Sequence, residues 1–139
     1  MANTETSTFF LVVKTPEKTF FSDVAEELVV ETPQGQIGIL PNHMPMVVSI
    51  TAGAMKIKQD GVWKEAFLSD GFMDINQSMV VVLADTAEWP EEIDINRAKR
   101  AEQRALERLQ GQLSHQDFVR SQAALQRALS RLKVSSHKN

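Results

Sequence analysis

The spacing of hydrophobic residues changes at Pro90 and divides the chain into two parts. Before Pro90, short runs rich in Val, Ile, Phe and Thr alternate with turn residues, and nine of the eleven Gly and Pro residues lie in this part. Such punctuation is typical of many short strands. We therefore expect an all-β structure over residues 8–86, with strands at residues 9–14, 25–32, 46–50, 54–59, 62–69 and 79–84.

Short strands of this kind bury both apolar faces only when one sheet packs against another, so a β-sandwich or flattened barrel is expected. The clearest turn is Asp60-Gly61, which tolerates the positive φ angles of a tight hairpin. The stretch GQIGILPNHMP, residues 35–45, contains glycines but lacks the GK[ST] ending of a phosphate-binding loop. It is expected to be a structured loop.

After Pro90 the apolar positions recur every three or four residues, which is the period of an amphipathic helix. Gly111 and Ser114 supply a helix stop and an N-cap in the middle of this part. We expect helices at about 94–110 and 115–133, joined as an antiparallel hairpin. The predicted fold is thus an α+β, two-part chain, with a β-sandwich at residues 1–88 and a helical hairpin at residues 89–139.

The expected hairpin has little apolar surface to bury. Each large apolar side chain is worth at most about 1.5–3 kcal/mol, whereas ordering some forty residues costs on the order of 1.5 kcal/mol per residue. We therefore expect the hairpin to be marginally stable and to need a partner or a ligand. The side chains expected to hold it are Ile95, Leu106, Leu109, Leu113, Phe118, Leu125, Leu129 and Leu132.

The charges follow the same division. The net charge of −3 combines a balance of −7 over residues 1–90 with +4 over residues 91–139, and all seven arginines follow residue 96. The chain has no cysteine, which excludes a disulfide, a thiolate nucleophile and a Cys-ligated metal. Its longest apolar run, residues 79–84, is far too short to span a bilayer. A soluble chain without direct membrane insertion is expected.

Arginines on both expected helices fall on one face of each helix. At about 100° per residue, Arg97, Arg104 and Arg108 lie within roughly 40° of each other. Arg120, Arg127 and Arg131 have the same spacing and also lie within roughly 40°. Acids that would neutralise these stripes are scarce, so the stripes are either solvated faces or the binding site of an anion. Small flanking residues would let the helices bring their arginines together around a polyphosphate: Ala98, Ala101, Ala105, Ala124 and Ala128.

Two other functions have less support from the residues. A basic hairpin that binds nucleic acid is the alternative, but Phe118 is the only aromatic residue after residue 96, and the acidic β-part would repel a long polyanion. An enzyme is disfavoured, because His43, His115 and His137 lie in three separate contexts without an HExxH or GxSxG motif.

Four stretches in sequence order resemble the epsilon subunit of rotary (F-type) ATP synthases of the bacterial, ATP-binding type. They are TPQGQIGILPNHMPMVVSITAGAMKI, LSDGFMDI, VVVLADTAE and IDINRA, and the likeness covers nearly the whole chain. The chain departs from the family pattern at Asn42 and Asp70, where family members usually have Gly. Asn tolerates positive φ, so the first departure is mild.

The resemblance implies a non-catalytic rotor component of a proton-translocating ATP synthase. The β-sandwich would attach to the gamma subunit and to the c-ring. The hairpin would fold on the sandwich or extend towards the alpha and beta catalytic subunits, where it inhibits ATP hydrolysis. The subunit would be peripheral, on the cytoplasmic face of the cell membrane. The implied contact with the rotor ring comprises Gln34, Gly35, Gln36, Ile37, Gly38, Pro41, Asn42 and His43.

The resemblance also implies ATP as a regulatory ligand that is not hydrolysed, and no metal is required by the sequence. The family's I/L-D-x-x-R-A motif is matched by IDINRA, in which Asp94 would accept a hydrogen bond from the adenine amino group. The arginines would face the triphosphate. The implied ATP-binding residues are Glu88, Ile93, Asp94, Arg97, Ala98, Arg104, Arg127 and Arg131.

Overall fold

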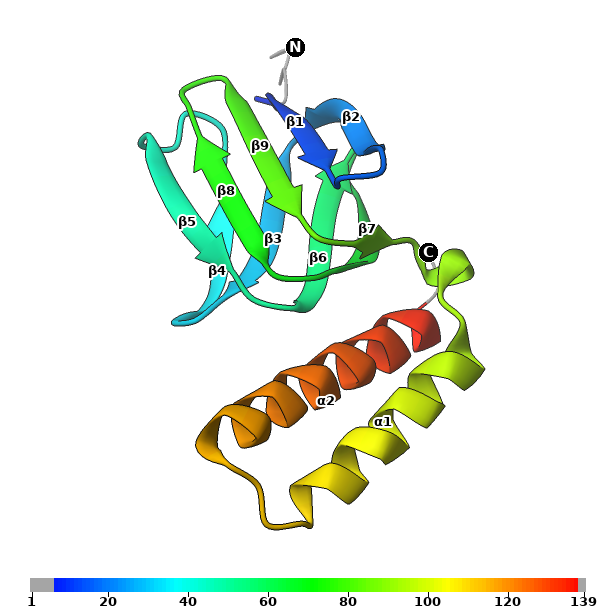
Figure 1. The fold of residues 1–139 in the computed structure, drawn as a ribbon. Helices are drawn as coiled ribbons and strands as arrows, with labels where there is room; N and C mark the ends of the chain where they lie inside the picture. Colours follow the sequence, from blue (N-terminus) through cyan, green and yellow to red (C-terminus); the bar gives the residue numbers. More distant parts are fainter. Residues whose placement is uncertain (1–6, 138–139) are drawn as a thin grey trace.

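Two five-stranded sheets make up the N-terminal part of the chain, and two helices follow them (Figure 1). The computed structural model describes residues 7–137. The first sheet has the order β2 (Thr19–Ala25), β1 (Phe9–Lys14), β9 (Met79–Ala84), β8 (Gly71–Ile75) and β5 (Met46–Ile50). The second has the order β10 (Ala87–Glu88), β7 (Val62–Leu68), β6 (Gly53–Gln59), β3 (Glu27–Thr32) and β4 (Gly35–Ile39). Neighbouring strands are antiparallel except β1 and β9.

Alternation along the strands builds the core between the two sheets. Leu11 and Val13 of β1 and Met55 and Ile57 of β6 are fully buried in the core, whereas Val12 and Lys56, which lie between them, do not belong to the inter-sheet cluster. Buried side chains from both sheets form one continuous cluster. The prediction of a β-sandwich followed by two helices is therefore confirmed.

The structure has strands that the sequence pattern did not reveal. The expected strand at 25–32 is the last residue of β2 followed by β3, and residues 71–75 form β8. The loop expected at residues 35–45 is wrong in its first half, because Gly35–Ile39 form β4, which pairs with β3 at the edge of the sheet. An edge strand buries only one residue here, Ile39, so it lacks the apolar run that marks a strand in a sequence.

Two turns behave as their residues predict. Asp60 and Gly61 have φ angles of 50° and 75° and join β6 to β7 through a two-residue hairpin turn. Asn42 has a φ of 64°, the left-handed conformation that Asn accepts more readily than most residues. The departure from glycine at Asn42 is therefore compatible with the backbone of this loop.

The C-terminal part is an antiparallel hairpin of α1 (Ile95–Leu109) and α2 (His115–Ser136), preceded by a short 3-10 turn, η1 (Pro90–Glu92). Ser114 caps α2 through a 3.2 Å hydrogen bond from the Asp117 N–H to the Ser114 hydroxyl. The helix α2 lies between α1 and the sandwich (Figure 1). Within the described residues, neither helix is long and apolar enough to cross a membrane.

The helix α2 extends three residues beyond the predicted end at residue 133, and the packing of its last turn explains this extension. Val134 is buried against Phe67 of β7 and Ala52, together with Ile93 of the linker, in a second, smaller core. This core joins the hairpin to the outer surface of the second sheet. The predicted helix ended at residue 133 because the sequence pattern cannot show a tertiary contact made by a single valine.

Small residues, rather than large apolar ones, fill the contact between the two helices. Ala98, Ala105, Ser121 and Ala128 are buried. Half of the eight large apolar side chains of the hairpin are substantially exposed, so they contribute less than the upper bound for full burial. They are Ile95, Leu106, Phe118 and Leu129, at 39%, 41%, 41% and 43% exposure. Small side chains let the two helices approach closely, so the larger apolar side chains lie at the edge of the helix–helix contact.

Gly71 provides a test of the sandwich packing. A Cβ at this position would overlap the Leu83 carbonyl oxygen and Ala84 on the neighbouring strand β9. We expect Gly71→Ala to lower the free energy of unfolding by about 1–3 kcal/mol, as overpacking does in well-packed cores. Urea denaturation measures this change. The control Gly38→Ala meets only the Glu27 side chain at 3.6 Å and should unfold like the unchanged chain. Equal stability of the two variants would contradict the packing at β8.

Candidate functional site

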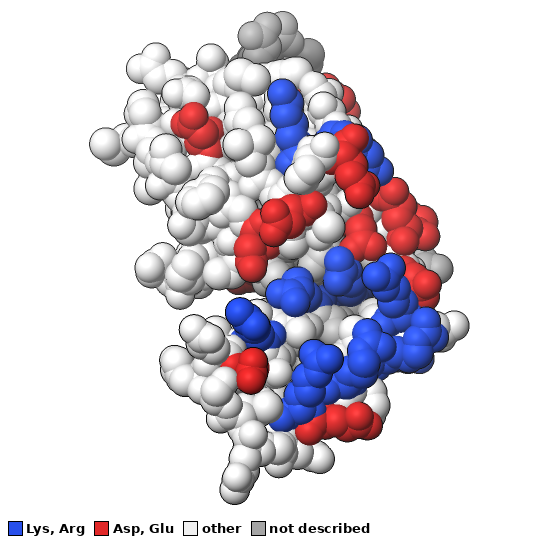
Figure 2. Space-filling model, in the orientation of Figure 1, with Lys and Arg blue, Asp and Glu red and all other residues white. Residues whose placement is uncertain are grey.

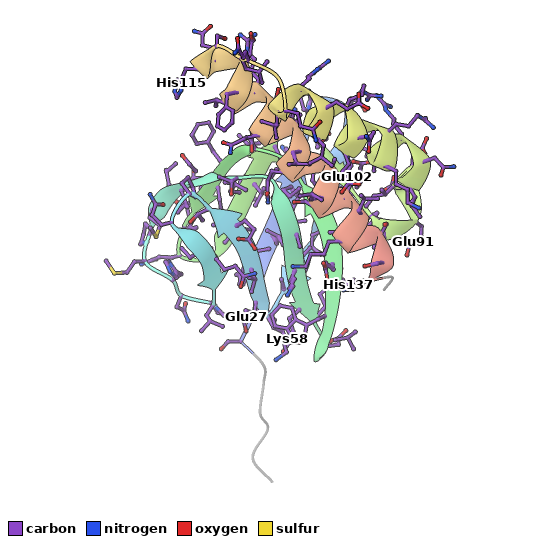
Figure 3. The ribbon with its side chains drawn as sticks, turned by 90° about the horizontal axis from the view of Figure 1, so that it is seen from below. Glu27, Lys58, Glu91, Glu102, His115 and His137 are labelled. Carbon is purple, nitrogen blue, oxygen red and sulfur yellow. The ribbon has the colours of Figure 1, made fainter. Side chains whose placement is uncertain are left out.

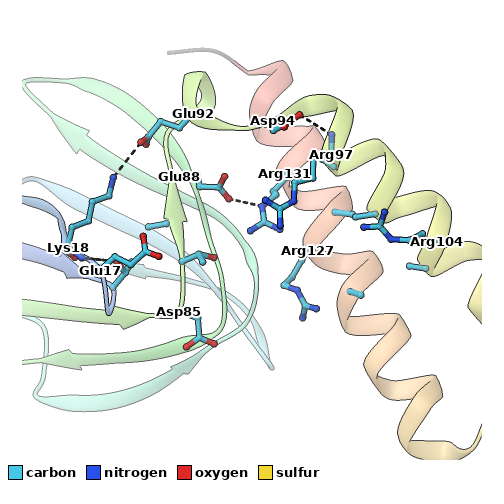
Figure 4. A pocket seen from close by; sticks show the side chains of 18 of the residues that line it. Glu17, Lys18, Asp85, Glu88, Glu92, Asp94, Arg97, Arg104, Arg127 and Arg131 are labelled. Atoms are coloured by element: carbon cyan, nitrogen blue, oxygen red, sulfur yellow. Dashed lines mark hydrogen bonds and ion pairs between the residues drawn. The ribbon is translucent and has the colours of Figure 1, made fainter.

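A cavity of about 750 Å³ lies between the hairpin and the sandwich (Figure 4). Five arginines form its hairpin wall: Arg97, Arg104 and Arg108 from α1, and Arg127 and Arg131 from α2. The opposite wall comes from the β1–β2 turn and the segment around β10, and it contains Glu17, Lys18, Asp85 and Glu88. Five of the six arginines of the two predicted stripes therefore meet at one site, and Arg120 does not line it.

The two walls carry opposite charge. Figure 2 shows Lys and Arg gathered over the hairpin and Asp and Glu on the sandwich beside them. Apart from Lys18, the charged residues that the β-part and the linker contribute to the cavity are acids, namely Glu17, Asp85, Glu88, Glu92 and Asp94. Guanidinium groups on one wall and carboxylates on the other attract each other across the cavity. This attraction favours the folded-down position of the hairpin.

Alanines line the cavity between the arginine rows. The prediction that small residues flank the stripes and bring the two helices close together is confirmed. Because an alanine side chain ends at Cβ, it leaves room for the long arginine side chains to converge above it. The alanines concerned are Ala98, Ala101, Ala105, Ala124 and Ala128.

Arg131 links the hairpin directly to the sandwich. Its Nε donates a 2.6 Å hydrogen bond to Oε1 of Glu88, and its guanidinium lies 4.4 Å from the centre of the Phe67 ring. The side chains of Arg131 and Glu88 are only 27% and 26% exposed, which protects their ion pair from screening by salt. Both are implied ATP-binding residues, and here they bind each other. An anionic ligand would compete with Glu88 for Arg131.

Asp94 has a structural role at the start of α1. It is the N-cap residue, and its Oδ1 accepts a 3.0 Å hydrogen bond from the N–H of Arg97. A carboxylate has two oxygens that each accept hydrogen bonds, so capping engages only part of its capacity. The remaining lone pairs of the Asp94 carboxylate could accept the implied hydrogen bond from an adenine amino group.

Ile93 is the one implied ATP-binding residue that does not line the cavity. It is 7% exposed and packs with Phe67, Val134 and Ala52 in the second core. The other seven line the cavity together. Ile93 therefore fixes where the linker leaves the sandwich, and any effect on a ligand would be indirect.

The residues implied in the ring contact do not form one loop. They follow the edge strand β4 from the turn before it to the connection after it. Gln36 lies on β4 and donates a 2.9 Å hydrogen bond to Glu31. His43 lies beyond the other end of the strand, with its Nδ1 2.9 Å from the Met44 carbonyl oxygen. An edge strand with both its ends is thus the surface that these residues share.

The histidines are not brought together. His115 and His137 lie at opposite ends of α2 (Figure 3), and His43 lies in the connection after β4. His137 approaches Glu65 of β7 at 3.6 Å, where the end of α2 meets the second sheet. Over residues 7–137, no group of three His, Asp or Glu side chains is arranged to hold a metal ion.

A second surface of interest is the outer side of the first sheet. Five exposed apolar side chains on β2, β5, β8 and β9 point away from the core there, beside the polar Ser49 and Asp74, and we call this surface the outer apolar face. Exposed apolar patches of this kind mark interaction sites in soluble proteins. Its residues are Val24, Val47, Phe72, Met79 and Leu83, at 50%, 69%, 59%, 39% and 52% exposure.

Several residues that line the cavity were not among the predicted site residues. Arg108 lies on the predicted stripe of α1 and could have been assigned from its position alone. Thr15, Glu17, Lys18 and Asp85 have no such signal, because they reach the cavity only through the packing of the hairpin against the sandwich.

Replacing Asp94 separates its capping role from its charge. We expect Asp94→Ala to destabilise the first turn of α1 by about 1 kcal/mol, because an unpaired backbone N–H is left at the helix end. Asp94→Asn should retain most of the stability, since Asn is an equally good N-cap. Amide hydrogen exchange at residues 95–98 measures the difference. Equal loss of protection in both variants would show that charge, not capping, matters.

Comparison with known proteins places the chain in a family. Residues 8–90 match the ATP synthase delta/epsilon chain beta-sandwich domain, and residues 91–136 match the long alpha-helix domain of the same chain. The ATP synthase epsilon chain of Caldanaerobacter subterraneus subsp. tengcongensis is 50% identical over 93% of this chain and 94% of the relative. That of Ruminiclostridium cellulolyticum is 47% identical over 95% and 98%.

Solved structures agree on the fold. A chain in the cryo-EM structure of the Euglena gracilis mitochondrial ATP synthase, OSCP/F1/c-ring, superposes with a TM-score of 0.80 at 20% identity, over 94% of this chain and 82% of the other. Since two family models follow one another across residues 8–136 and curated relatives are about half identical over nearly their whole length, this chain belongs to the ATP synthase delta/epsilon family.

Proposed function

We propose that this chain is the epsilon subunit of a proton-driven rotary ATP synthase, and that its hairpin binds ATP as a regulatory ligand without hydrolysing it. The observation that carries the ATP-binding proposal is the convergence of five arginines from two helices on one cavity. Guanidinium groups recognise phosphate oxygens through paired, charge-assisted hydrogen bonds. A triphosphate is a compact polyanion that several arginines can contact at once.

The geometry supports a small ligand over nucleic acid. The arginines face a cavity whose opposite wall carries Glu17, Asp85 and Glu88, and these acids would repel a long polyanion lying across the opening. Phe118, the aromatic residue of α2, does not line the cavity and offers no stacking platform there. A ligand that fits between the walls meets the arginines without extending over the acidic surface.

The weak attachment of the hairpin suits a regulatory role. Ile93 and Val134 are the large apolar side chains that the linker and α2 bury in the second core, worth together about 3–6 kcal/mol before entropy is subtracted. A ligand that binds only the docked form stabilises that form by about 2.7 kcal/mol at a hundredfold excess over Kd. The two quantities are comparable, so ATP can decide whether the hairpin stays docked. When released, the hairpin would extend towards the alpha and beta subunits and inhibit ATP hydrolysis.

The sandwich supplies surfaces for the rotor partners. The outer apolar face fits a permanent partner, because an assembled subunit would bury it, and we assign it to the gamma subunit. The edge strand β4 and its two ends are assigned to the c-ring. The subunit would then lie peripherally on the cytoplasmic face of the cell membrane, held there by these partners.

The ATP proposal is tested by thermal melting of the helical signal. ATP should raise the melting temperature of the hairpin, and Arg127→Ala should remove most of that rise, because it deletes a charge-assisted contact worth roughly 1.5–3 kcal/mol. Arg120→Ala is the matched control, since Arg120 lies on the same helix but does not line the cavity. A melt that millimolar ATP does not move would refute the ligand site.

Comparison of GTP with ATP tests the role of Asp94 towards the base. Guanine carries an oxygen where adenine carries its amino group, so the Asp94 carboxylate would face another acceptor. GTP should therefore raise the melting temperature less than ATP does. Equal shifts with both nucleotides would remove Asp94 from base recognition and leave it only as the cap of α1.

The gamma assignment is tested by co-purification with the gamma subunit. Phe72→Glu places a charge at an exposed position of the outer apolar face and should abolish co-purification. Val62→Glu changes a comparably exposed apolar residue of the second sheet and should leave it intact. If Phe72→Glu still co-purifies with gamma while Val62→Glu does not, the partner binds the second sheet instead.

A further inference from the structure

Lys18 is the one basic residue that the sandwich places in the cavity, among the residues that the structure describes. It lies in the turn between β1 and β2, where the Thr15 hydroxyl accepts a 3.3 Å hydrogen bond from the Lys18 N–H. The Thr15 N–H also donates a 2.9 Å hydrogen bond to the Lys18 carbonyl oxygen. The backbone of Lys18 is thus fixed on the sandwich, while its long side chain reaches the linker.

The ammonium group of Lys18 has a partner that it can exchange. Its Nζ lies 3.5 Å from Oε2 of Glu92, and the two side chains are 52% and 42% exposed. An exposed ion pair of this length contributes little to stability. The other oxygen of Glu92, Oε1, accepts a 2.9 Å hydrogen bond from the Trp89 N–H. Glu92 therefore keeps its place in the linker when Lys18 moves away.

The position of Lys18 matters because all five arginines of the cavity lie on the hairpin. A ligand held by these arginines alone would fasten α1 to α2, but it would not hold the hairpin on the sandwich. A ligand that also contacts a cation of the β1–β2 turn joins the two parts of the chain. Figure 4 shows Lys18 on the sandwich side of the site, with the arginines on the helices opposite.

We propose that Lys18 is a ligand-binding residue that leaves Glu92 and contacts the phosphates of the bound nucleotide. This inference rests on the proposed binding of ATP and adds, beside the implied contact with Glu88, a cationic contact through which ATP holds the hairpin against the sandwich. Phosphate, with a higher charge than one carboxylate, is the stronger partner for the ammonium group. The released Glu92 still accepts the Trp89 N–H and keeps the linker in place.

The affinity of the full chain for ATP, measured by isothermal titration calorimetry, tests the proposal with four variants. Lys18→Gln should weaken binding about tenfold, which corresponds to loss of one charge-assisted contact. Lys18→Arg should retain most of the affinity. Lys14→Gln removes the same charge from a nearby strand end that does not line the cavity and should bind ATP like the unchanged chain.

The variant Glu92→Gln shows whether Lys18 contacts the ligand or only forms an ion pair with Glu92. The amide oxygen of Gln still accepts the Trp89 N–H, but the competitor for Lys18 is gone, so affinity should be unchanged or higher. If Lys18→Gln and Glu92→Gln weaken binding alike, Lys18 acts only through the ion pair and the inference is wrong. It is also wrong if Lys18→Gln matches Lys14→Gln while Arg127→Ala loses affinity, an outcome that leaves the ATP site intact. An unchanged chain that does not bind ATP overturns both proposals.

Discussion

The contact between the last turns of α2 and the second sheet is the interaction on which the rest of the site depends. Arg131 is held between the Glu88 carboxylate and the Phe67 ring, and Val134 packs on the same phenylalanine beside Ile93. Of these residues, Arg131 and Glu88 line the cavity, while Phe67, Val134 and Ile93 hold the end of α2 in place from outside it. Without it, the two arginine stripes and the acidic wall of the sandwich would lie in separate regions of the molecule.

The charges around the cavity would make the stability of the docked hairpin depend on bound anions. Across the cavity, arginines on the helices face carboxylates on the sandwich, and Arg131 is paired with Glu88. A polyphosphate brings far more negative charge than one carboxylate, so it can recruit the remaining arginines at little conformational cost. The same five guanidinium groups repel each other when no anion is present. The hairpin is therefore attracted to the sandwich while its own arginines repel each other, so an anion bound among them would raise its stability.

Much of this architecture could be predicted from the sequence because the relevant signals are local. Asp60-Gly61 determines its turn through backbone preference, Ser114 determines the start of α2 through capping, and the three- to four-residue spacing places the arginines on shared faces. The edge strand β4 was missed because it buries only one side chain. Lys18 and the last turn of α2 were missed because their roles arise from packing between segments far apart in sequence. The exposure of Leu106 and Leu129 has the same origin, since the spacing shows which face is apolar but not how closely two helices approach.

The most direct test of the account is the distance between the tip of the hairpin and the far end of the sandwich. The chain has no cysteine, so Asn76→Cys and Gln110→Cys, both at exposed positions, allow a pair of nitroxide labels to be attached specifically. Electron–electron double resonance then reports the distribution of distances with and without ATP. The account predicts a broad distribution without nucleotide, which ATP narrows to the single distance of the docked hairpin. A distribution that ATP leaves unchanged, under conditions where calorimetry shows that ATP is bound, would contradict the claim that nucleotide holds the hairpin on the sandwich.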